Sequence, residues 1–246
     1  MTRPEPESGT DKTPARIVGM FDDIAPRYDV LNRVLSAGFD VRWRARAIRS
    51  LRLSGAETVL DLCTGTADVA IAAATASPGA RRVVGVDFAL QMLKLGLAKL
   101  PPRGLAGTIH LVQGDAMALP AATCSVEAAT VAFGIRNVQQ PDVTYAEVFR
   151  VLRPGGRFAI LEFGTPPWPG IRQLYLAYFK FLLPRIGRLV SGHSSAYTYL
   201  PASVGAFPEP ARVVASLENR GFRDVKAVPL TLGVVYLYSA RKPPSR

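Results

Sequence analysis

Residues 58–68 of the chain read TVLDLCTGTAD, and this stretch decides the fold. Thr58 to Leu62 form a short run of apolar and β-branched residues, which is the composition of a buried strand. A polar turn containing Gly65 follows, and the alanine-rich run from Val69 to Ala76 has the composition of a helix. A strand that turns directly into a helix is the first part of a βαβ unit, whose next strand runs parallel to the first.

Strand and helix patterns alternate along most of the remaining chain. Further strands are expected at residues 82–87, 108–113, 126–133, 157–163, 225–229 and 234–240, and further helices at 89–100, 143–152 and 213–219. This alternation predicts an α/β fold: a Rossmann-like, mostly parallel sheet of seven strands that binds ligands at the carboxyl ends of its strands.

The segments around this pattern complete the domain plan. Residues 1–14 are polar and are expected to be a disordered tail, and residues 15–53 are expected to form a helical cover. Residues 54–243 form the Rossmann-like domain, with a helix and a loop inserted on the substrate side at about 165–210. Within that insertion, 171–189 is predicted to be a helix broken at Pro184, and the charge-free run 189–208 a loop, because it is rich in Gly, Ser, Pro and Tyr.

Composition and charge restrict the partners and the compartment. The chain of 246 residues carries a formal net charge of +11 and has a pI near 10.1. This charge favours nucleic acid or an anionic membrane as a partner, and is explained equally well by a general use of arginine for solubility. No apolar run approaches the roughly 20 residues that span a bilayer, and the N-terminus lacks the apolar stretch of a signal peptide, so a cytoplasmic location is expected. Cys63 and Cys124 belong to no cluster of metal-ligand type, and no metal site is expected.

Three carboxylates stand where successive strands end. Asp61 closes the first strand ahead of Gly65, which lets a ligand approach the backbone closely. Asp87 closes the second strand, where a carboxylate can accept both hydroxyls of a ribose, and Asp115 follows the third, where it can accept an adenine amino group. Together they outline an adenosine-shaped ligand, and the single glycine disfavours the pyrophosphate of NAD or FAD. Each aspartate taken alone can equally be a helix cap.

These stretches, with Leu152-Arg153-Pro154-Gly155-Gly156, resemble the class I S-adenosylmethionine-dependent methyltransferases. The resemblance implies S-adenosyl-L-methionine as the cofactor. It also implies the cofactor-binding residues, which are Asp61, Gly65, Thr66, Asp87, Asp115, Ala116 and Ala132. Ala132 departs from the family pattern, which often has a small polar residue there.

Further motifs resemble a narrower family, the demethylmenaquinone and 2-polyprenyl-6-methoxybenzoquinol C-methyltransferases. The motifs are Tyr28-Asp29-Val30-Leu31-Asn32, Phe133-Gly134-Ile135-Arg136-Asn137-Val138, Leu161-Glu162-Phe163 and Tyr197-Thr198-Tyr199-Leu200-Pro201-Ala202-Ser203. The resemblance runs from about residue 19 to 240 and implies a polyprenylated quinol as substrate, in menaquinone or ubiquinone biosynthesis.

Methylation of a quinol ring carbon needs a deprotonated ring oxygen, and Arg136 is expected to stabilise the quinolate that forms. The resemblance likewise places Arg136 and Asn137 at the reacting ring as catalytic residues. Tyr28, Tyr197 and Tyr199 are expected to bind the ring, with core packing as the alternative for each tyrosine. An ion pair between Arg136 and a surface carboxylate is the alternative to its catalytic role. His193, in a Gly- and Ser-rich stretch, ranks below Arg136.

Other functions stay open at this point. The alternatives are a methyltransferase of another small lipophilic substrate and a non-catalytic cofactor-binding scaffold. A nucleic-acid methyltransferase is disfavoured because residues 133–136 read FGIR and not Asn/Asp-Pro-Pro-aromatic, so no nucleic-acid partner is expected.

A peripheral membrane contact is expected from two segments. Residues 33–52 hold six arginines against the single carboxylate of Asp40, and residues 174–183 are strongly apolar. Packing of this second segment inside the domain, or in a homodimer contact, is the alternative.

Overall fold

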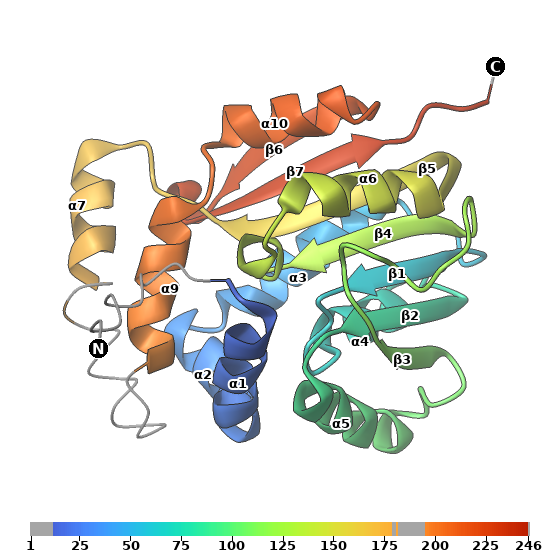
Figure 1. Cartoon of the computed structure of the whole chain (residues 1–246), viewed down its shortest axis with the longest axis horizontal. Helices are drawn as coiled ribbons and strands as arrows, with labels where there is room; N and C mark the ends of the chain where they lie inside the picture. The colour runs from blue at the N-terminus through green and yellow to red at the C-terminus, as the bar shows by residue number, and fades with distance from the viewer. Residues whose placement is uncertain (1–11, 179–180, 182–194, 246) are drawn as a thin grey trace, which may run out of the picture.

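The computed structural model describes residues 12–178, 181 and 195–245. Its centre is one sheet with the strand order β3-β2-β1-β4-β5-β7-β6 (Figure 1). The strands are β1 (Thr58–Leu62), β2 (Arg82–Asp87), β3 (Ile109–Gln113), β4 (Val126–Ala132), β5 (Leu152–Phe163), β6 (Arg223–Leu230) and β7 (Val235–Arg241). The first five pair in parallel and β7 runs antiparallel to both of its neighbours, which confirms the predicted fold.

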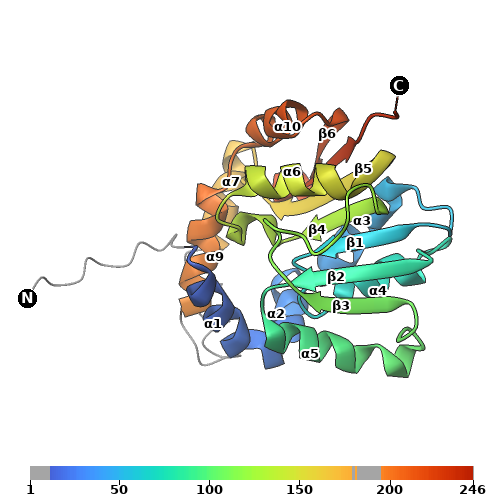
Figure 2. The same ribbon diagram turned by 45° about the vertical axis from the view of Figure 1, so that its right-hand side comes forward.

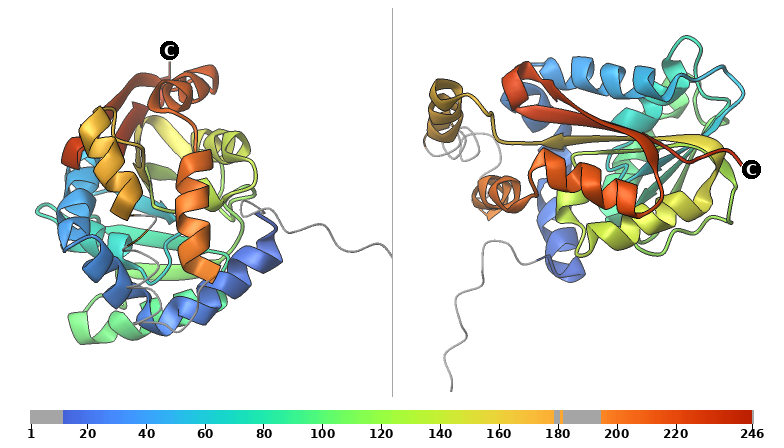
Figure 3. Two further views of the ribbon diagram at one scale, coloured as in Figure 1. Left: turned by 90° about the vertical axis from the view of Figure 1, so that its left-hand side faces the viewer. Right: turned by 90° about the horizontal axis from the view of Figure 1, so that it is seen from above.

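Helices cover both faces of this sheet, as an all-apolar parallel strand requires. On one face lie α3 (Phe39–Leu51) and α4 (Asp68–Thr75), and on the other lie α6 (Pro141–Val151) and α10 (Pro210–Asn219) (Figures 1 and 3). Helix α5 (Leu90–Lys99) lies beside the edge strand β3, and the short 3-10 turn η2 (Pro101–Arg103) follows it. Successive residues of β1 serve different cores: Val59 packs with Trp43 of α3, and Leu60 packs with Phe158 in the core of the opposite face.

Four helices of the described residues gather at the edge where the parallel strands end. They are α1 (Pro14–Ile24) and α2 (Tyr28–Leu35), joined by the 3-10 turn η1 (Ala25–Arg27), together with α7 (Pro169–Ala177) and α9 (Ser195–Ala206). Figure 3 (left) shows them around the strand ends, and Figure 2 shows α1 lying between α9 and α5. Within the described part of the chain, no helix is long and apolar enough to cross a membrane.

Two expectations for the element boundaries are wrong. Part of the predicted loop at 189–208 is the helix α9, although Pro201 stands inside it. Packing overrides propensity here, because Tyr199, Ser203 and Val204 are buried against neighbouring elements. The turn at residues 154–156 does not precede β5 but lies within it, where Gly155 has a φ of +81° and the pairing with β4 shifts register. The predicted tail and the second half of the helix at 171–189 lie mostly outside the described residues.

Candidate active site

A first cavity, of about 110 Å³, lies over the ends of β1 to β4. Its floor is built by residues at the four strand ends, namely Gly65, Asp87, Asp115, Ala116, Ala132 and Phe133. Ile17, Val18 and Phe21 of α1 form its roof. Helix α1 therefore lies over the strand-end carboxylates.

Asp87 lies at the end of β2, as predicted, and two hydrogen bonds fix the orientation of its carboxylate. Its Oδ2 accepts the backbone N–H of Gly65 at 2.7 Å, and its Oδ1 accepts that of Ala89 at 2.9 Å. Burial raises the pKa of Asp87, against these hydrogen bonds, which lower it. The carboxylate therefore holds the turns at the ends of β1 and β2 and lines the cavity, but it does not cap α5, whose N-cap residue is Ala89 with no side-chain cap. Each oxygen keeps a lone pair for a ribose hydroxyl.

Asp115 has a similar double role at the third strand end. Its Oδ1 accepts the backbone N–H of Met117 at 2.8 Å, and the residue lines the cavity together with Ala116. Ala132 lines the same cavity from β4, so the structure brings these predicted residues together. Carboxylate acceptors at the second and third strand ends, over an open backbone at Gly65, suit an adenosine whose hydroxyls and amino group need acceptors.

Asp61 and Thr66 stand behind the cavity wall. Asp61 is buried, and its Oδ2 accepts the hydroxyl of Thr64 at 2.6 Å. Its Oδ1 is buried without a hydrogen-bond partner among the described residues, and burial raises the pKa of Asp61 to about 7. Thr66 is turned away from the cavity, and its hydroxyl donates to Asp29 of α2 at 2.5 Å. Neither side chain lines the cavity, and their predicted contact with the cofactor stays a prediction.

A second cavity, of about 380 Å³, adjoins the first under the helical cover. Its wall is mainly apolar and aromatic, with side chains from α1, α2, α3, α7 and α9 and from the ends of β4 and β5. Phe21, Tyr28 and Phe133 line both cavities. A ligand in one cavity is thus separated from a ligand in the other only by shared side chains, which is the arrangement that a group transfer needs.

Arg136 is the polar centre of the second cavity. It is 7% exposed, and its Nη1 donates to Oε1 of Glu162 at 2.7 Å and to the carbonyl of Phe133. Glu162 is fully buried and also accepts the backbone N–H groups of Arg136 and Phe163. The Arg136 guanidinium lies 5.4 Å from the centre of the Phe163 ring, and its Nε has no hydrogen-bond partner among the described residues. The carboxylate that pairs with Arg136 is therefore buried, not on the surface, and part of the guanidinium remains for a ligand.

The predicted ring-binding residues are only partly assembled. Asn137 lines the first cavity, and its Oδ1 accepts the hydroxyl of Tyr199 at 3.1 Å, which ties α9 to the end of β4. Tyr28 stands at the start of α2 with its ring edge-on to Phe21, and burial raises the pKa of Tyr28. The side chain of Tyr197 and the whole of His193 lie outside the described residues.

Sequence reasoning assigned no role to three residues at this site. Glu162 had a signal, a single carboxylate in the otherwise apolar strand run 158–163. Lys12 lines the first cavity and donates to the carbonyl of Val138 at 3.3 Å, and burial lowers the pKa of Lys12. Its place in the predicted tail gave no indication of this. Asp29 was quoted only as part of a motif.

Comparison with known proteins agrees with this geometry. The model of the ubiE/COQ5 methyltransferase family matches residues 9–242. The chain is 50% identical over 220 residues to the ubiquinone/menaquinone biosynthesis C-methyltransferase UbiE of Syntrophotalea carbinolica, covering 89% of this chain and 91% of that one. It is 43% identical over 224 residues to the demethylmenaquinone methyltransferase of Thermus thermophilus, covering 91% and 100%.

Among solved structures, the [4+2]-cyclase SpnF shares the fold with a TM-score of 0.70 at 17% identity, covering 95% of this chain and 98% of that one. A putative methyltransferase from Bacillus halodurans does so with a TM-score of 0.58 at 20% identity, covering 81% and 98%. The match to the family model extends over nearly the whole chain, so the protein belongs to the ubiE/COQ5 methyltransferase family and is an S-adenosylmethionine-dependent methyltransferase.

Proposed function

We propose that the protein methylates a ring carbon of a polyprenylated quinol, a demethylmenaquinol in menaquinone biosynthesis, with a ubiquinone precursor as the second candidate. The observation that carries the proposal is the pair of adjoining cavities, one with strand-end carboxylates and the other apolar, with Arg136 at its wall. The printed names of the relatives, a demethylmenaquinone methyltransferase among them, support the same substrate class.

The cofactor-side residues divide the ligand between them. In this proposal Asp87 accepts the ribose hydroxyls, Asp115 accepts the adenine amino group, and Gly65 gives the backbone close access. Bound S-adenosylmethionine supplies an electrophilic methyl group on a sulfonium. Phe21, Tyr28 and Phe133 keep water from the junction of the cavities, where the methyl group and the ring carbon meet.

The substrate-side residues make the ring carbon nucleophilic. A neutral quinol is a weak nucleophile, and the loss of a hydroxyl proton raises the electron density on the ring carbons. The Arg136 guanidinium stabilises the developing oxyanion, in a wall apolar enough to strengthen that attraction. Asn137, held by Tyr199, orients a ring hydroxyl or a water molecule that carries the proton away.

Methyl transfer from labelled S-adenosylmethionine tests the proposal. The purified protein is given short-chain demethylmenaquinol or a demethylated ubiquinol precursor, kept reduced, and the product is analysed by mass spectrometry. We expect the label on a ring carbon of the naphthoquinol. Label on a ring oxygen, or on neither quinol but on a phenolic lipid, would establish the alternative of another lipophilic substrate. Cofactor binding without transfer to any acceptor would establish a scaffold.

A peripheral membrane contact belongs to the same proposal. Apolar side chains are exposed around the second cavity: on α7 Leu174 is 73% and Leu176 52% exposed, and on α2 Val30 is 59% exposed. Leu174 also lines the cavity, so the exposed patch is continuous with the substrate wall. Arg42, Arg46 and Arg49 are exposed on α3, although Arg44 is held in ion pairs. A prenyl chain and acidic headgroups suit these two surfaces.

Vesicle co-sedimentation measures this contact. Binding should require anionic lipid and weaken with salt, because the Debye length is about 10 Å at 0.1 M. The double substitution Leu174→Ser/Leu176→Ser should reduce it several-fold, whereas Leu97→Ser should not, although Leu97 on α5 is 48% exposed, close to Leu176. Unchanged vesicle binding of the double variant contradicts the membrane contact. A loss of self-association in light scattering would instead assign the patch to a homodimer.

A further inference from the structure

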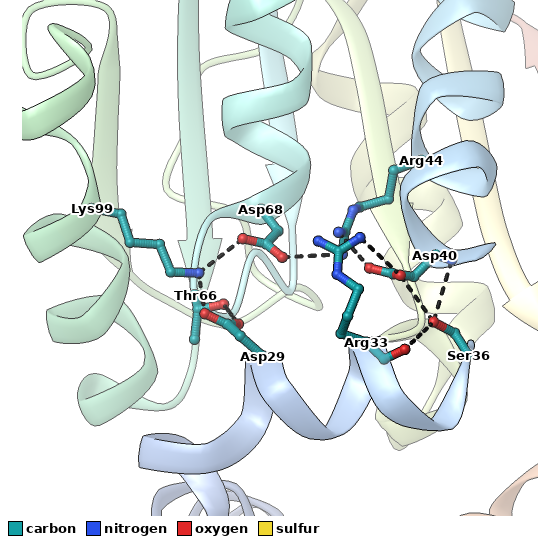
Figure 4. Close-up of polar contacts among 8 residues, drawn as sticks. All are labelled: Asp29, Arg33, Ser36, Asp40, Arg44, Thr66, Asp68 and Lys99. Carbon is teal, nitrogen blue, oxygen red and sulfur yellow. Dashed lines mark hydrogen bonds and ion pairs between the residues drawn. The ribbon is translucent and has the colours of Figure 1, made fainter. Parts of the chain in front are cut away.

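A chain of ion pairs connects the helical cover to the methyltransferase core (Figure 4). Its six members alternate in sign, so their charges cancel; in order they are Asp29, Lys99, Asp68, Arg44, Asp40 and Arg33. The separations run from 2.5 Å between Lys99 and Asp29 to 3.3 Å between Arg33 and Asp40. We call this set the ion-pair chain.

The ion-pair chain crosses between separate elements. Asp29 and Arg33 belong to α2, Asp40 and Arg44 to α3, Asp68 begins α4 and Lys99 ends α5. Thr66 adds its hydroxyl to Asp29 at one end, and Ser36 adds its hydroxyl to Asp40 at 2.9 Å at the other (Figure 4). The cover helices are thereby attached to the two helices that follow the first and second strands.

Three members of the ion-pair chain are shielded from water: the side chains of Asp40, Arg44 and Lys99 are 6%, 11% and 18% exposed. Asp68 is 32% and Asp29 40% exposed. Exposed ion pairs contribute little, but loss of one partner from a buried network leaves the others uncompensated. The shielded ammonium of Lys99 therefore ties Asp29, at the start of α2, to α5.

Asp29 is connected to the walls of both cavities through neighbouring residues. The preceding residue, Tyr28, lines both cavities, and the partner Thr66 follows Gly65, which lines the cofactor cavity. Lys99 and Thr66 both bind the Asp29 carboxylate, at 2.5 Å each. A shift of the Gly65 loop is thus transmitted to Tyr28 through one hydrogen bond and one peptide unit. In the proposed function the cofactor contacts the Gly65 backbone, so its binding acts on one end of this connection.

We propose that Asp29 is a positioning residue that couples cofactor binding to completion of the substrate wall. With the cofactor in place, the Gly65–Thr66 loop is fixed, and Thr66 and Lys99 hold Asp29 so that Tyr28 closes the wall between the cavities. Release of the demethylated cofactor loosens the same contacts and opens the cover. The coupling is reciprocal, so a quinone ligand also tightens the cofactor. The identity of this second ligand rests on the proposed function.

The coupling is measured as a ratio of two affinities. A short-chain demethylmenaquinone is titrated with and without saturating S-adenosylhomocysteine, in the parent and in the variants Asp29→Ala and Lys99→Met. In the parent we expect the thioether to tighten the quinone about tenfold, within the range typical of coupled sites. In both variants the ratio should fall to within about twofold of unity. Lys94→Met is the matched control, because it removes an exposed lysine from the same helix, and its ratio should match the parent.

A merely structural role predicts a different pattern, in which the variants lose thermal stability and keep the ratio. That result, or a parent ratio of one, overturns the proposal. Hydrogen exchange of the α2 amides supplies a readout that needs no quinone. S-adenosylhomocysteine should protect α2 in the parent and not in Lys99→Met, and equal protection in both overturns the coupling even if the substrate is not a quinol. Failure of the quinone to bind, with α2 protection lost in the variant, contradicts only the proposed substrate.

Discussion

The cavities that we assign to the cofactor and to the substrate are built from different parts of the chain. The floor of the cofactor cavity rests on four consecutive strand ends, where Gly65 donates to Asp87, whereas its roof comes from α1. The substrate cavity is assembled from the ends of β4 and β5 and from helices at both ends of the chain. The floor of the first cavity therefore depends on local sequence and sheet order, whereas the second cavity depends on packing between distant segments.

Their electrostatics differ in the same way. The cofactor side distributes its charge over several carboxylates that are partly satisfied by backbone N–H groups. The substrate side holds its charge in two ion pairs with little exposure: Arg136 with Glu162, beside the Phe163 ring, and Arg44 with Asp40, which also line the cavity. A substitution on the cofactor side should thus weaken cofactor binding, and a substitution on the substrate side should lower turnover.

Arg136→Ala tests the substrate side and should have the largest effect. Removing one preorganised donor to a developing oxyanion typically costs about a hundred- to a thousandfold in turnover. We expect a loss of that size in kcat, with the affinity for S-adenosylhomocysteine unchanged, since Arg136 does not line the cofactor cavity. Steady-state kinetics and calorimetry give the two numbers. If turnover stays within a few-fold of the parent, Arg136 serves only its ion pair.

Asp87→Ala is the corresponding change on the cofactor side. A hydrogen bond to a charged group contributes about 1.5–3 kcal/mol, so the affinity for S-adenosylmethionine should fall about ten- to a hundredfold. The fold should survive, because the lost contacts are two hydrogen bonds to backbone N–H groups of loop residues, Gly65 and Ala89. Calorimetry measures the affinity and circular dichroism the fold. An unchanged affinity in a folded variant contradicts the ribose assignment.

The cofactor side could largely be predicted from the sequence. The observed bounds of β1 and β2 coincide with the predicted strands, because short apolar runs between polar turns leave few alternatives. Parallel strands then bring Asp87 and Asp115 to one edge whatever the helices do. The orientation of Thr66 could not be predicted, since its partner Asp29 lies 37 residues away in the sequence.

The substrate side was predicted by motif more than by physics. Arg136, Tyr28 and Tyr199 do line its cavity. The chemistry of their side chains indicated this together with the family resemblance, and their spacing did not. Helix α9 was missed because Pro201 and its small residues disfavour a helix, and only tertiary burial stabilises it. The pairing of Arg136 with Glu162 required knowledge that β4 and β5 are adjacent in register.

Glu162→Gln separates the charge of the buried pair from its shape. Glutamine keeps an acceptor for Arg136 and leaves the guanidinium without a counter-charge in an apolar wall. We expect kcat to fall about tenfold, which corresponds to a loss of about 1.4 kcal/mol of transition-state stabilisation. The affinity for the cofactor should be unchanged. Combined with Arg136→Lys, the loss should be smaller than the product of the single losses. Glu147→Gln, which breaks a pair with Arg150 away from both cavities, should stay within about twofold. Additive losses would mean that Glu162 acts independently of Arg136.

Asp61→Asn should have the smallest effect on binding and turnover, because its side chain does not line the cavity, and should act on the pH dependence of stability. Burial raises the pKa of Asp61 to about 7, whereas the unfolded chain has about 3.9. Between these values the folded protein holds a proton that the unfolded chain does not hold. The contribution to the free energy of unfolding is therefore fully present below pH 4 and falls by up to about 1.4 kcal/mol per pH unit until pH 7.

Asparagine cannot titrate, so the parent should lose stability relative to Asp61→Asn as the pH rises through this window. Urea unfolding of both proteins without ligand, at pH 5 and at pH 7, measures the difference, and titrating groups that do not interact with Asp61 cancel in the comparison. If the two proteins keep a constant difference across the window, the carboxyl group of Asp61 does not titrate there in the folded protein, which contradicts the raised pKa.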